Sequence, residues 1–230
     1  MKKIFTLMAL AALGTALVFH SCKKDDKNNN SNSNNNNTTQ ATCSDGIQNQ
    51  GETDVDCGGP CASCDEKYLC TGKGSNSYFP LKEGNYWIWT SSMYGIIKHL
   101  ITEKVMDGVT PYYHCEEYVQ NIQMSDWYYR VDPNGDVYYS TNPNTSGSYS
   151  LKVPGSPYIN QKWKSGTDSM RVTSLNASYN TTKCNYTGLL EISVKYAGDV
   201  ANNYYEIIYY KKGIGSIYNG DANLTGVNLN

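Results

Sequence analysis

From about Tyr78 to the end of the chain, apolar residues fall in short runs that are separated by turn residues. The runs are rich in Tyr, Ile, Val, Thr and Trp, and they recur about every eight to twelve positions without a sustained helical period. Short, evenly spaced runs of β-branched and aromatic residues are typical of antiparallel strands. We therefore predict an all-β domain over residues 76–230, built as a curved antiparallel sheet, a sandwich, or a barrel or half-barrel.

Two turn sequences predict hairpins within this domain. The tetrapeptide Asp-Pro-Asn-Gly at 132–135 places each residue where a type I turn prefers it. It joins the run 127–131 to the run 137–141. Asp107-Gly108 similarly predicts a tight hairpin between the runs 96–105 and 109–119.

The run from Leu189 to Tyr196 alternates as a half-buried strand does. Its apolar set is Leu190, Ile192, Val194 and Tyr196, and its polar set is Glu191, Ser193 and Lys195. Because successive side chains of a strand point to opposite faces, these two sets face the core and the solvent respectively. The next run, 204–211, carries Tyr and Ile on both faces, so neither face is simply polar.

Tyrosine is unusually frequent, with 21 residues, and doublets begin at positions 112, 128, 138, 204 and 209. One ring of each doublet must point away from the main core. Together with Trp87, Trp89, Trp127 and Trp163, these rings could form a platform for sugar rings or the wall of a cleft for an apolar ligand. The alternative is that they are cross-strand pairs that stabilise the sheet.

The first residues of the chain have the order of a targeting segment: Lys2 and Lys3, then an apolar run over 4–19 that is marginal for a membrane span. The following Val-Phe-His-Ser-Cys at 18–22 resembles the lipobox of bacterial lipoproteins. The resemblance implies that residues 1–21 are a signal peptide and that Cys22 is acylated, palmitate being the expected chain. An ordinary secretory signal followed by an unrelated cysteine is the alternative.

Residues 22–42 are predicted to be a flexible tether. The segment 28–40 contains only Asn, Ser, Thr and Gln, so it has nothing to bury against the entropy of ordering. Before it, Lys-Lys-Asp-Asp-Lys at 23–27 resembles the signal that carries lipoproteins of Bacteroidota-type bacteria to the outer face of the outer membrane. That resemblance implies a cell-surface protein whose membrane partner is reached through the lipid.

Removal of the signal takes two of the 19 basic residues and none of the 21 acidic ones, which leaves a net charge of about −4. Nucleic-acid binding depends on basic surfaces that neutralise phosphates. We therefore expect no nucleic-acid partner.

Four cysteines, Cys43, Cys57, Cys61 and Cys64, lie in a stretch too short and too polar to fold around an apolar core. Export favours disulfides, in any of three connectivities. A zinc site of all four thiolates, or an iron–sulfur cluster on the spacing Cys57-x3-Cys61-x2-Cys64, is the alternative. The segment DGIQNQGETDVDCGG resembles a small Cys-rich module of secreted bacterial proteins, which implies a structural role for residues 43–70.

Two further expectations concern this part of the chain. Among Cys70, Cys115 and Cys184, the preferred third bridge joins Cys115 to Cys184, and one thiol is left over once Cys22 is acylated. The oxygen-bearing side chains of the module also suggest a Ca²⁺ site, with solvated turn residues as the alternative. They are Asp45, Asn49, Glu52, Asp54 and Asp56.

Two sequences bracket most of the large domain. YFPLKEGNYW at 78–87 resembles the opening, and YYKKGIGSI at 209–217 the closing hairpin, of a family of uncharacterised bacteroidete lipoprotein domains. The resemblance implies a β-rich extracytoplasmic domain, lipocalin-like or half-barrel in shape, without a recognised enzymatic activity.

Few residues of the mature chain suggest catalysis. His99 and His114 remain after processing, no nucleophile elbow, zinc-binding helix or phosphate loop occurs, and Glu116 and Glu117 would face opposite ways on a strand. We therefore expect a non-enzymatic envelope protein that binds a glycan or an apolar molecule, with a structural or adhesive role, or less readily a hydrolase, as alternatives. Asp-Ser-Met at 168–170 also matches a short O-glycosylation motif centred on Ser169.

Overall fold

The computed structural model describes residues 43–142, 149–198 and 206–230. The predicted signal peptide, the acylated Cys22 and the tether lie outside these residues. The described part is all-β, as predicted, with twelve antiparallel strands and one short helix, α1 (Cys64–Lys67). The strands are β1 (Tyr86–Ser91), β2 (Gly95–Asp107), β3 (Thr110–Val119), β4 (Ile122–Val131), β5 (Val137–Ser140), β6 (Ser150–Val153), β7 (Lys162–Ser165), β8 (Asp168–Asn180), β9 (Asn185–Lys195), β10 (Glu206–Lys211), β11 (Gly215–Asn219) and β12 (Ala222–Asn228).

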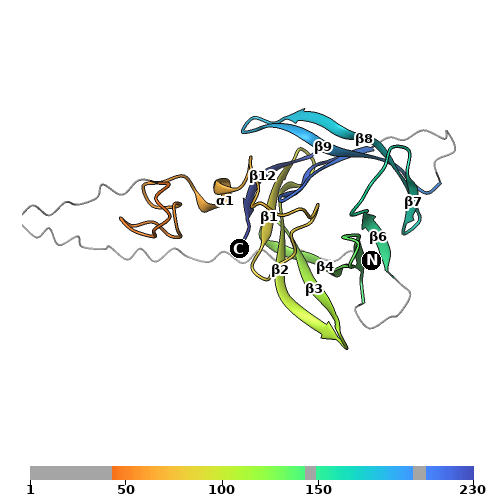
Figure 1. Ribbon diagram of the computed structural model, residues 1–230, viewed down its shortest axis with the longest axis horizontal. Coiled ribbons are helices and arrows are strands. Elements are labelled where there is room, and N and C mark those ends of the chain that lie inside the picture. The colour runs from red at the N-terminus through yellow and green to blue at the C-terminus, as the bar shows by residue number, and fades with distance from the viewer. Residues whose placement is uncertain (1–42, 143–148, 199–205) are drawn as a thin grey trace, which may run out of the picture. The chain divides into compact units, whose positions relative to one another are not determined.

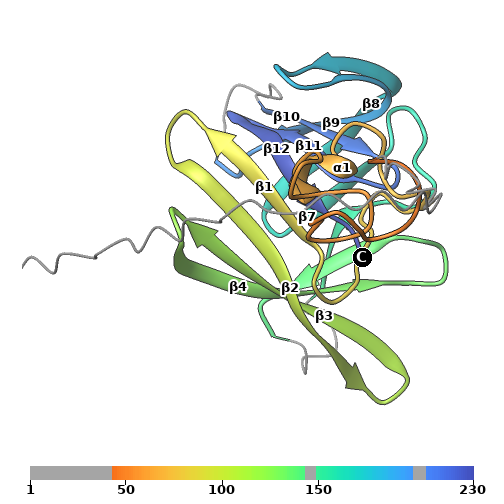
Figure 2. The same cartoon turned by 90° about the vertical axis from the view of Figure 1, so that its left-hand side faces the viewer.

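All twelve strands form one sheet, in the order β6-β5-β4-β3-β2-β1-β12-β11-β10-β9-β8-β7. Neighbours in the sheet are therefore neighbours in sequence, except where β1 pairs with β12. Figure 2 shows this sheet curling around a common interior, with β2, β3 and β4 on one side and β8 to β12 on the other. It is a nearly closed barrel rather than a sandwich.

The seam of the barrel lies between the edge strands β6 and β7. No ladder joins these two strands among the described residues, but the Trp163 indole Nε1–H donates to the carbonyl of Leu151 at 3.0 Å. The backbone N–H of Gly166 donates to the Ser150 hydroxyl at 3.1 Å. Side chains thus bring the two edges together, and both strands are only four residues long, as expected of protected edges.

The core occupies the interior of this sheet because every second residue points inward. In β9, Leu190, Ile192 and Val194 are buried, as predicted, and Tyr196 lies exposed just beyond the strand. Ser193 was predicted to face solvent but is buried as well, where its hydroxyl donates to that of Thr173. The largest fully buried side chains of the described residues are Trp87, Tyr186, Tyr210, Leu69, Ile101, Leu189, Leu190, Ile192, Ile214, Ile217, Leu224 and Val137.

Both predicted hairpins are present. Gly135 donates its N–H to the Asp132 carbonyl at 2.9 Å, and the Asp132 carboxylate accepts two further backbone N–H groups of the loop between β4 and β5. The pairing of Asp107 with Thr110 closes the turn between β2 and β3, where Gly108 has a φ of 59°. Left-handed backbone at this tip favours glycine.

The tyrosine doublets at 128 and 209 divide as expected, and the doublet at 204 lies outside the described residues. Tyr129 and Tyr210 are buried in the core, whereas Tyr128 stacks on His114 and Tyr209 stacks on Tyr179, on the other face of the sheet. The tryptophans do not follow the tyrosines outward: Trp87 is fully buried, and Trp89 is 5% exposed.

Residues 43–70 form a module that is held by disulfides, which confirms the prediction of disulfide bonds. Cys43 pairs with Cys61 and Cys57 pairs with Cys64. Helix α1 begins where the Ser63 hydroxyl accepts the N–H of Asp65, and it lies against β12. Figure 1 shows this helix next to β12, at the end of the sheet where the C-terminus lies.

The preferred third bridge, between Cys115 and Cys184, is wrong. Cys184 lies in the turn between β8 and β9 and pairs with Cys70, while Cys115 is a free, buried thiol in β3. The physical reason is placement: Cys115 points into the barrel, whereas the turn that carries Cys184 packs on the module. The Lys183 ammonium contacts the Glu66 carboxylate at 2.5 Å there, and Tyr186 donates its hydroxyl to the Leu69 carbonyl at 2.8 Å.

Among the residues that the structure describes, no helix has the length and apolar character needed to cross a membrane.

Candidate binding site in the barrel interior

A cavity of about 110 Å³ lies inside the barrel. It is lined by Phe79, Trp89, Ile97, His99, Glu117, Tyr129, Lys152, Tyr210, Ser216, Asn219 and Ala222. Asn219 is an exposed residue at the end of β11, so the cavity reaches the surface near the turn between β11 and β12. An apolar wall with a few converging polar groups is the usual composition of a small-molecule site.

Two of the polar groups, His99 and Glu117, come from one row across the sheet. In the register of β1 to β4, Trp87 lies opposite His99, His99 opposite Glu117, and Glu117 opposite Ser125. Directly opposed residues of antiparallel strands point to the same face. His99 Nε2 therefore lies 2.9 Å from one Glu117 oxygen, and the Ser125 hydroxyl donates to the other at 2.9 Å.

The surroundings fix the charges of this pair. Burial lowers the pKa of His99, against the opposing influence of Glu117. The hydrogen bond from His99 in turn holds the pKa of Glu117 below its usual range. At neutral pH the arrangement is therefore a neutral imidazole whose Nε2–H donates to an ionised carboxylate, and Glu117 has both oxygens engaged.

Aromatic rings surround the pair. Trp89 and Trp127 flank the His99 ring at centroid distances of 4.6 and 4.9 Å, the second in an edge-on contact. Deeper in the core, Phe79 packs against Tyr129 at 4.8 Å. These contacts fix the orientation of the imidazole and give the cavity rigid, flat walls.

Lys152 enters the cavity from the edge strand β6. The register between β5 and β6 shifts between Val137 and Tyr138, so β6 carries a bulge next to Lys152, and bulges redirect side chains. Burial lowers the pKa of its ammonium, while the charge of Glu206 acts in the opposite direction.

Cys115 lies in the same interior but has the properties of a core residue. It is fully buried, and burial together with Glu117 and Glu116 raises the pKa of its thiol. A thiolate is the reactive form of cysteine. Cys115 therefore remains a protonated thiol, which does not suit a nucleophile.

A second group of rings lies on the other face of the sheet. Tyr179, Tyr209 and Tyr218 have centroid distances of 4.9 to 6.0 Å from one another, and all three are partly exposed. The Tyr179 hydroxyl donates to the Asn223 amide oxygen at 2.6 Å. Tyr179 separates two shallow hollows, one of which is bordered by amide and hydroxyl side chains: Thr90, Asn180, Thr181, Thr182, Asn223 and Thr225. We call the rings of Tyr179, Tyr209 and Tyr218 the outer tyrosine cluster.

The carboxylates predicted to bind Ca²⁺ accept backbone N–H groups of the module's turns. Asp56 accepts the N–H of Gly46 with both oxygens, at 2.9 and 3.1 Å, and Glu52 accepts the N–H groups of Asn49 and Asp56. Asp45 and Asp54 accept nearby backbone N–H groups in the same way. Calcium binding by Asp45, Asn49, Glu52, Asp54 and Asp56 stays a prediction.

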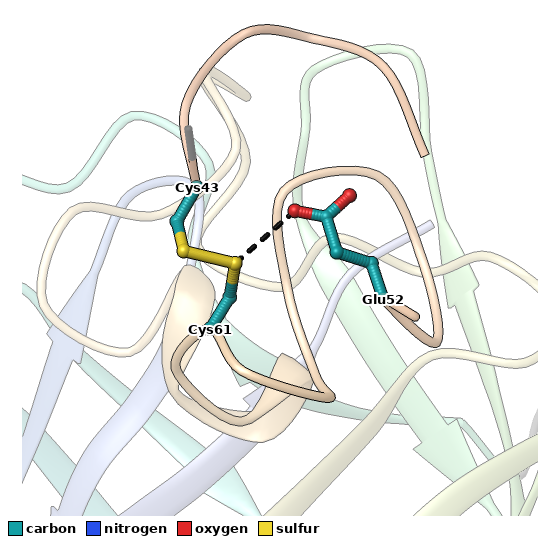
Figure 3. A group of neighbouring side chains, drawn as sticks. All are labelled: Cys43, Glu52 and Cys61. Carbon is teal, nitrogen blue, oxygen red and sulfur yellow. Dashed lines mark hydrogen bonds between the residues drawn. A yellow bond between two sulfur atoms is a disulfide. The ribbon is translucent and has the colours of Figure 1, made fainter. Parts of the chain in front are cut away.

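One group of three metal-type ligands, Cys43, Glu52 and Cys61, gathers within 4.8 Å in the described residues. Figure 3 shows that the two sulfurs are bonded to each other and that a Glu52 oxygen points at the Cys61 sulfur, 3.1 Å away. A bridged sulfur is not a thiolate ligand. The group is therefore a disulfide packed against a buried carboxylate.

The other sequence-predicted residues are dispersed. Ser169 lies in β8, where its hydroxyl accepts a hydrogen bond from the Lys164 ammonium at 2.7 Å. His114 bonds Asp126 at 2.8 Å on the face opposite the cavity. Sequence reasoning did not pair His99 with Glu117, nor single out Lys152. Because Glu117 lies two positions after Cys115, the sequence could have placed these two side chains on one face of the strand. Which residue of β2 lies opposite Glu117 is set by the strand register, and the sequence does not show it.

No protein-family model and no curated protein matches the chain. Among solved structures, the chain is similar to a predicted exported protein with a YmcC-like fold from Bacteroides fragilis NCTC 9343. The two are 11% identical, the match covers 65% of this chain and 94% of that one, and the TM-score is 0.40.

Proposed function

We propose that this protein is a lipid-anchored, non-enzymatic binding protein of the cell envelope, and that its barrel holds a small organic molecule. The observation that carries the proposal is the interior cavity, where aromatic walls meet His99, Glu117 and Lys152. Its volume of about 110 Å³ is somewhat below the roughly 150 Å³ of an engineered cavity that accepts benzene. The expected ligand is therefore no larger than one ring, or extends through the mouth near Asn219.

The order of the polar groups favours binding over hydrolysis. In a catalytic triad the hydroxyl bonds the imidazole, which in turn bonds the carboxylate. Here the Ser125 hydroxyl donates to Glu117, and the carboxylate stands between the hydroxyl and His99. The imidazole is thus not positioned to activate that hydroxyl. The row instead presents a fixed polar wall to a ligand.

Neutral benzyl alcohol is a suitable first probe because it has one ring and no charge. We expect its addition to shift the indole N–H signals of Trp89 and Trp127 in amide NMR spectra. Ala222→Leu, which fills the cavity, should abolish the shifts, whereas Ser178→Leu, on an exposed position of β8, should preserve them. Absence of any shift at saturating alcohol would contradict interior binding.

The lipid anchor is tested separately. The lipobox motif supports attachment at Cys22, and the Lys-Asp-rich residues 23–27 support the outer face of the outer membrane. Cys22→Ala should release a folded, soluble protein from cells. A variant that still sediments with membranes would show that another part of the chain holds the membrane.

The outer tyrosine cluster supports a second candidate function, glycan binding. Sugar rings stack on flat aromatic faces, and the bordering amide and hydroxyl groups can bond sugar hydroxyls. On a glycan array, Tyr209→Ala should lose any bound glycan that wild type retains. Tyr158→Ala removes an exposed tyrosine outside the cluster and is the matched control. Equal glycan binding by both variants would exclude the outer tyrosine cluster as the glycan-binding site.

A further inference from the structure

Lys152 differs from the other charged groups of the cavity. Glu117 has His99 and Ser125 as hydrogen-bond partners. By contrast, no hydrogen-bond acceptor and no carboxylate at ion-pair distance meets the Lys152 ammonium in the described part of the chain. Its contact is the face of Tyr139, 5.7 Å from the ring centroid.

Lys152 is half-buried, and its ammonium is not fully removed from solvent. Partial removal of a charge from water still favours pairing or hydrogen bonding. Glu206 acts on Lys152 only through space, and the tyrosine face contributes a weak attraction. An oxyanion that entered the cavity would supply the missing acceptor.

We propose that the interior site selects small molecules with a carboxylate head group, which pairs with Lys152 while the apolar part of the ligand lies against Trp89, Tyr129 and Tyr210. This inference rests on the proposed interior binding. A single negative charge is preferred over two because the ionised Glu117 lines the same cavity. Charge-assisted hydrogen bonds to a carboxylate are about twice as strong as neutral ones.

An alternative role for Lys152 is protection of an edge strand. Inward-pointing charges are one means by which edge strands avoid pairing with other chains. Under that role the side chain would affect association between molecules, and it would not discriminate between ligands by charge. A binding experiment with ligands of different charge therefore distinguishes anion binding by Lys152 from protection of the edge strand.

The experiment compares four probes that share one ring: benzoate, benzyl alcohol, benzylamine and phenyl phosphate. Affinities are measured by NMR titration or calorimetry on the mature protein. We expect benzoate to bind at least about tenfold more tightly than benzyl alcohol, and benzylamine to bind more weakly than the alcohol. Phenyl phosphate should bind more weakly than benzoate; tighter binding would overturn the carboxylate assignment.

Lys152→Met should remove the preference for benzoate while the affinity for benzyl alcohol stays within about twofold of wild type. Lys162→Met makes the same change at an exposed position of the facing edge strand β7 and should behave as wild type. If Lys152→Met does not fold, Lys152→Gln serves the same comparison with a polar side chain.

The outcomes distinguish the two proposals. Benzyl alcohol that binds without a benzoate preference, or a preference that survives in Lys152→Met, would overturn anion selection and leave interior binding intact. Failure of all four probes to bind would overturn interior binding itself.

Discussion

The Cys-rich module over residues 43–70 and the barrel that follows it are stabilised by different interactions. Among the described residues of the module, Cys57 and Leu69 are the buried apolar ones, and Leu69 packs with the core of the barrel. Its loops are held by two disulfides and by carboxylates that accept backbone N–H groups. The barrel has a continuous apolar core that includes Trp87, Ile101 and Ile192.

The difference follows from size and composition. A segment of fewer than about 40 residues cannot bury enough apolar surface to offset its conformational entropy, so covalent links replace the core. The barrel has surplus apolar surface. It can therefore keep a small cavity that is lined by the half-buried side chains of His99, Glu117 and Lys152.

The largest expected effect is on the barrel core. Trp87→Ala removes a fully buried indole whose N–H donates to the Ile214 carbonyl at 2.5 Å. We expect a loss of about 3–5 kcal/mol in the free energy of unfolding, measured by denaturant titration. The module disulfides should still form, as seen by mass spectrometry after thiol alkylation. A loss below about 1 kcal/mol would contradict the assignment of Trp87 to the core.

The next effect concerns the link between the two regions. The double variant Cys70→Ser, Cys184→Ser removes a bridge that spans 114 residues. We expect a loss of about 2–4 kcal/mol in the stability of the barrel, because the unfolded chain gains freedom. A matched comparison is Cys57→Ser, Cys64→Ser, which should loosen the module and change the barrel much less. Equal losses in the two double variants would mean that the regions unfold as one unit.

A smaller effect is expected within the module. Glu52→Gln keeps the size of the side chain but removes the charge that accepts the N–H groups of Asn49 and Asp56. We expect a local cost of about 1–3 kcal/mol, detected as faster hydrogen exchange of these two amides. Asp54→Asn, at an exposed position of the same loop, is the control and should leave both amides protected.

The smallest effect tests the interior pair. Because burial lowers the pKa of His99 below its ordinary value of 6.5, the unfolded chain binds more protons than the folded one below about pH 6.5. Stability therefore falls as the pH drops through that value. His99→Gln retains an N–H donor for Glu117 and should flatten the stability profile between pH 7 and about 5.5. His114→Gln keeps the interior histidine, so its profile should still decline; a flat profile in both variants would place the effect elsewhere.

The local patterns were sufficient for much of the fold. The inward-facing apolar positions 190, 192 and 194 and the Asp-Pro-Asn-Gly turn at 132–135 depend on neighbours in sequence, and both are confirmed by the structure. The polar, cysteine-rich composition of residues 43–64 likewise predicted disulfide cross-links, although it did not show which cysteines pair. The choice between sandwich and barrel depends on how all twelve strands curl together, and no single apolar run of the sequence determines it.

By itself, the sequence determined which segments form strands, where two hairpins turn, and that the module needs disulfides, because propensity, turn chemistry and the shortage of apolar surface act locally. The tertiary structure alone decided that Cys184 pairs with Cys70 rather than with Cys115, since the turn after β8 packs on the module. It also decided that His99 meets Glu117, and that Lys152 turns inward. Register and closure place distant strands side by side, and these pairings are set by the packing of the whole sheet rather than by any one strand.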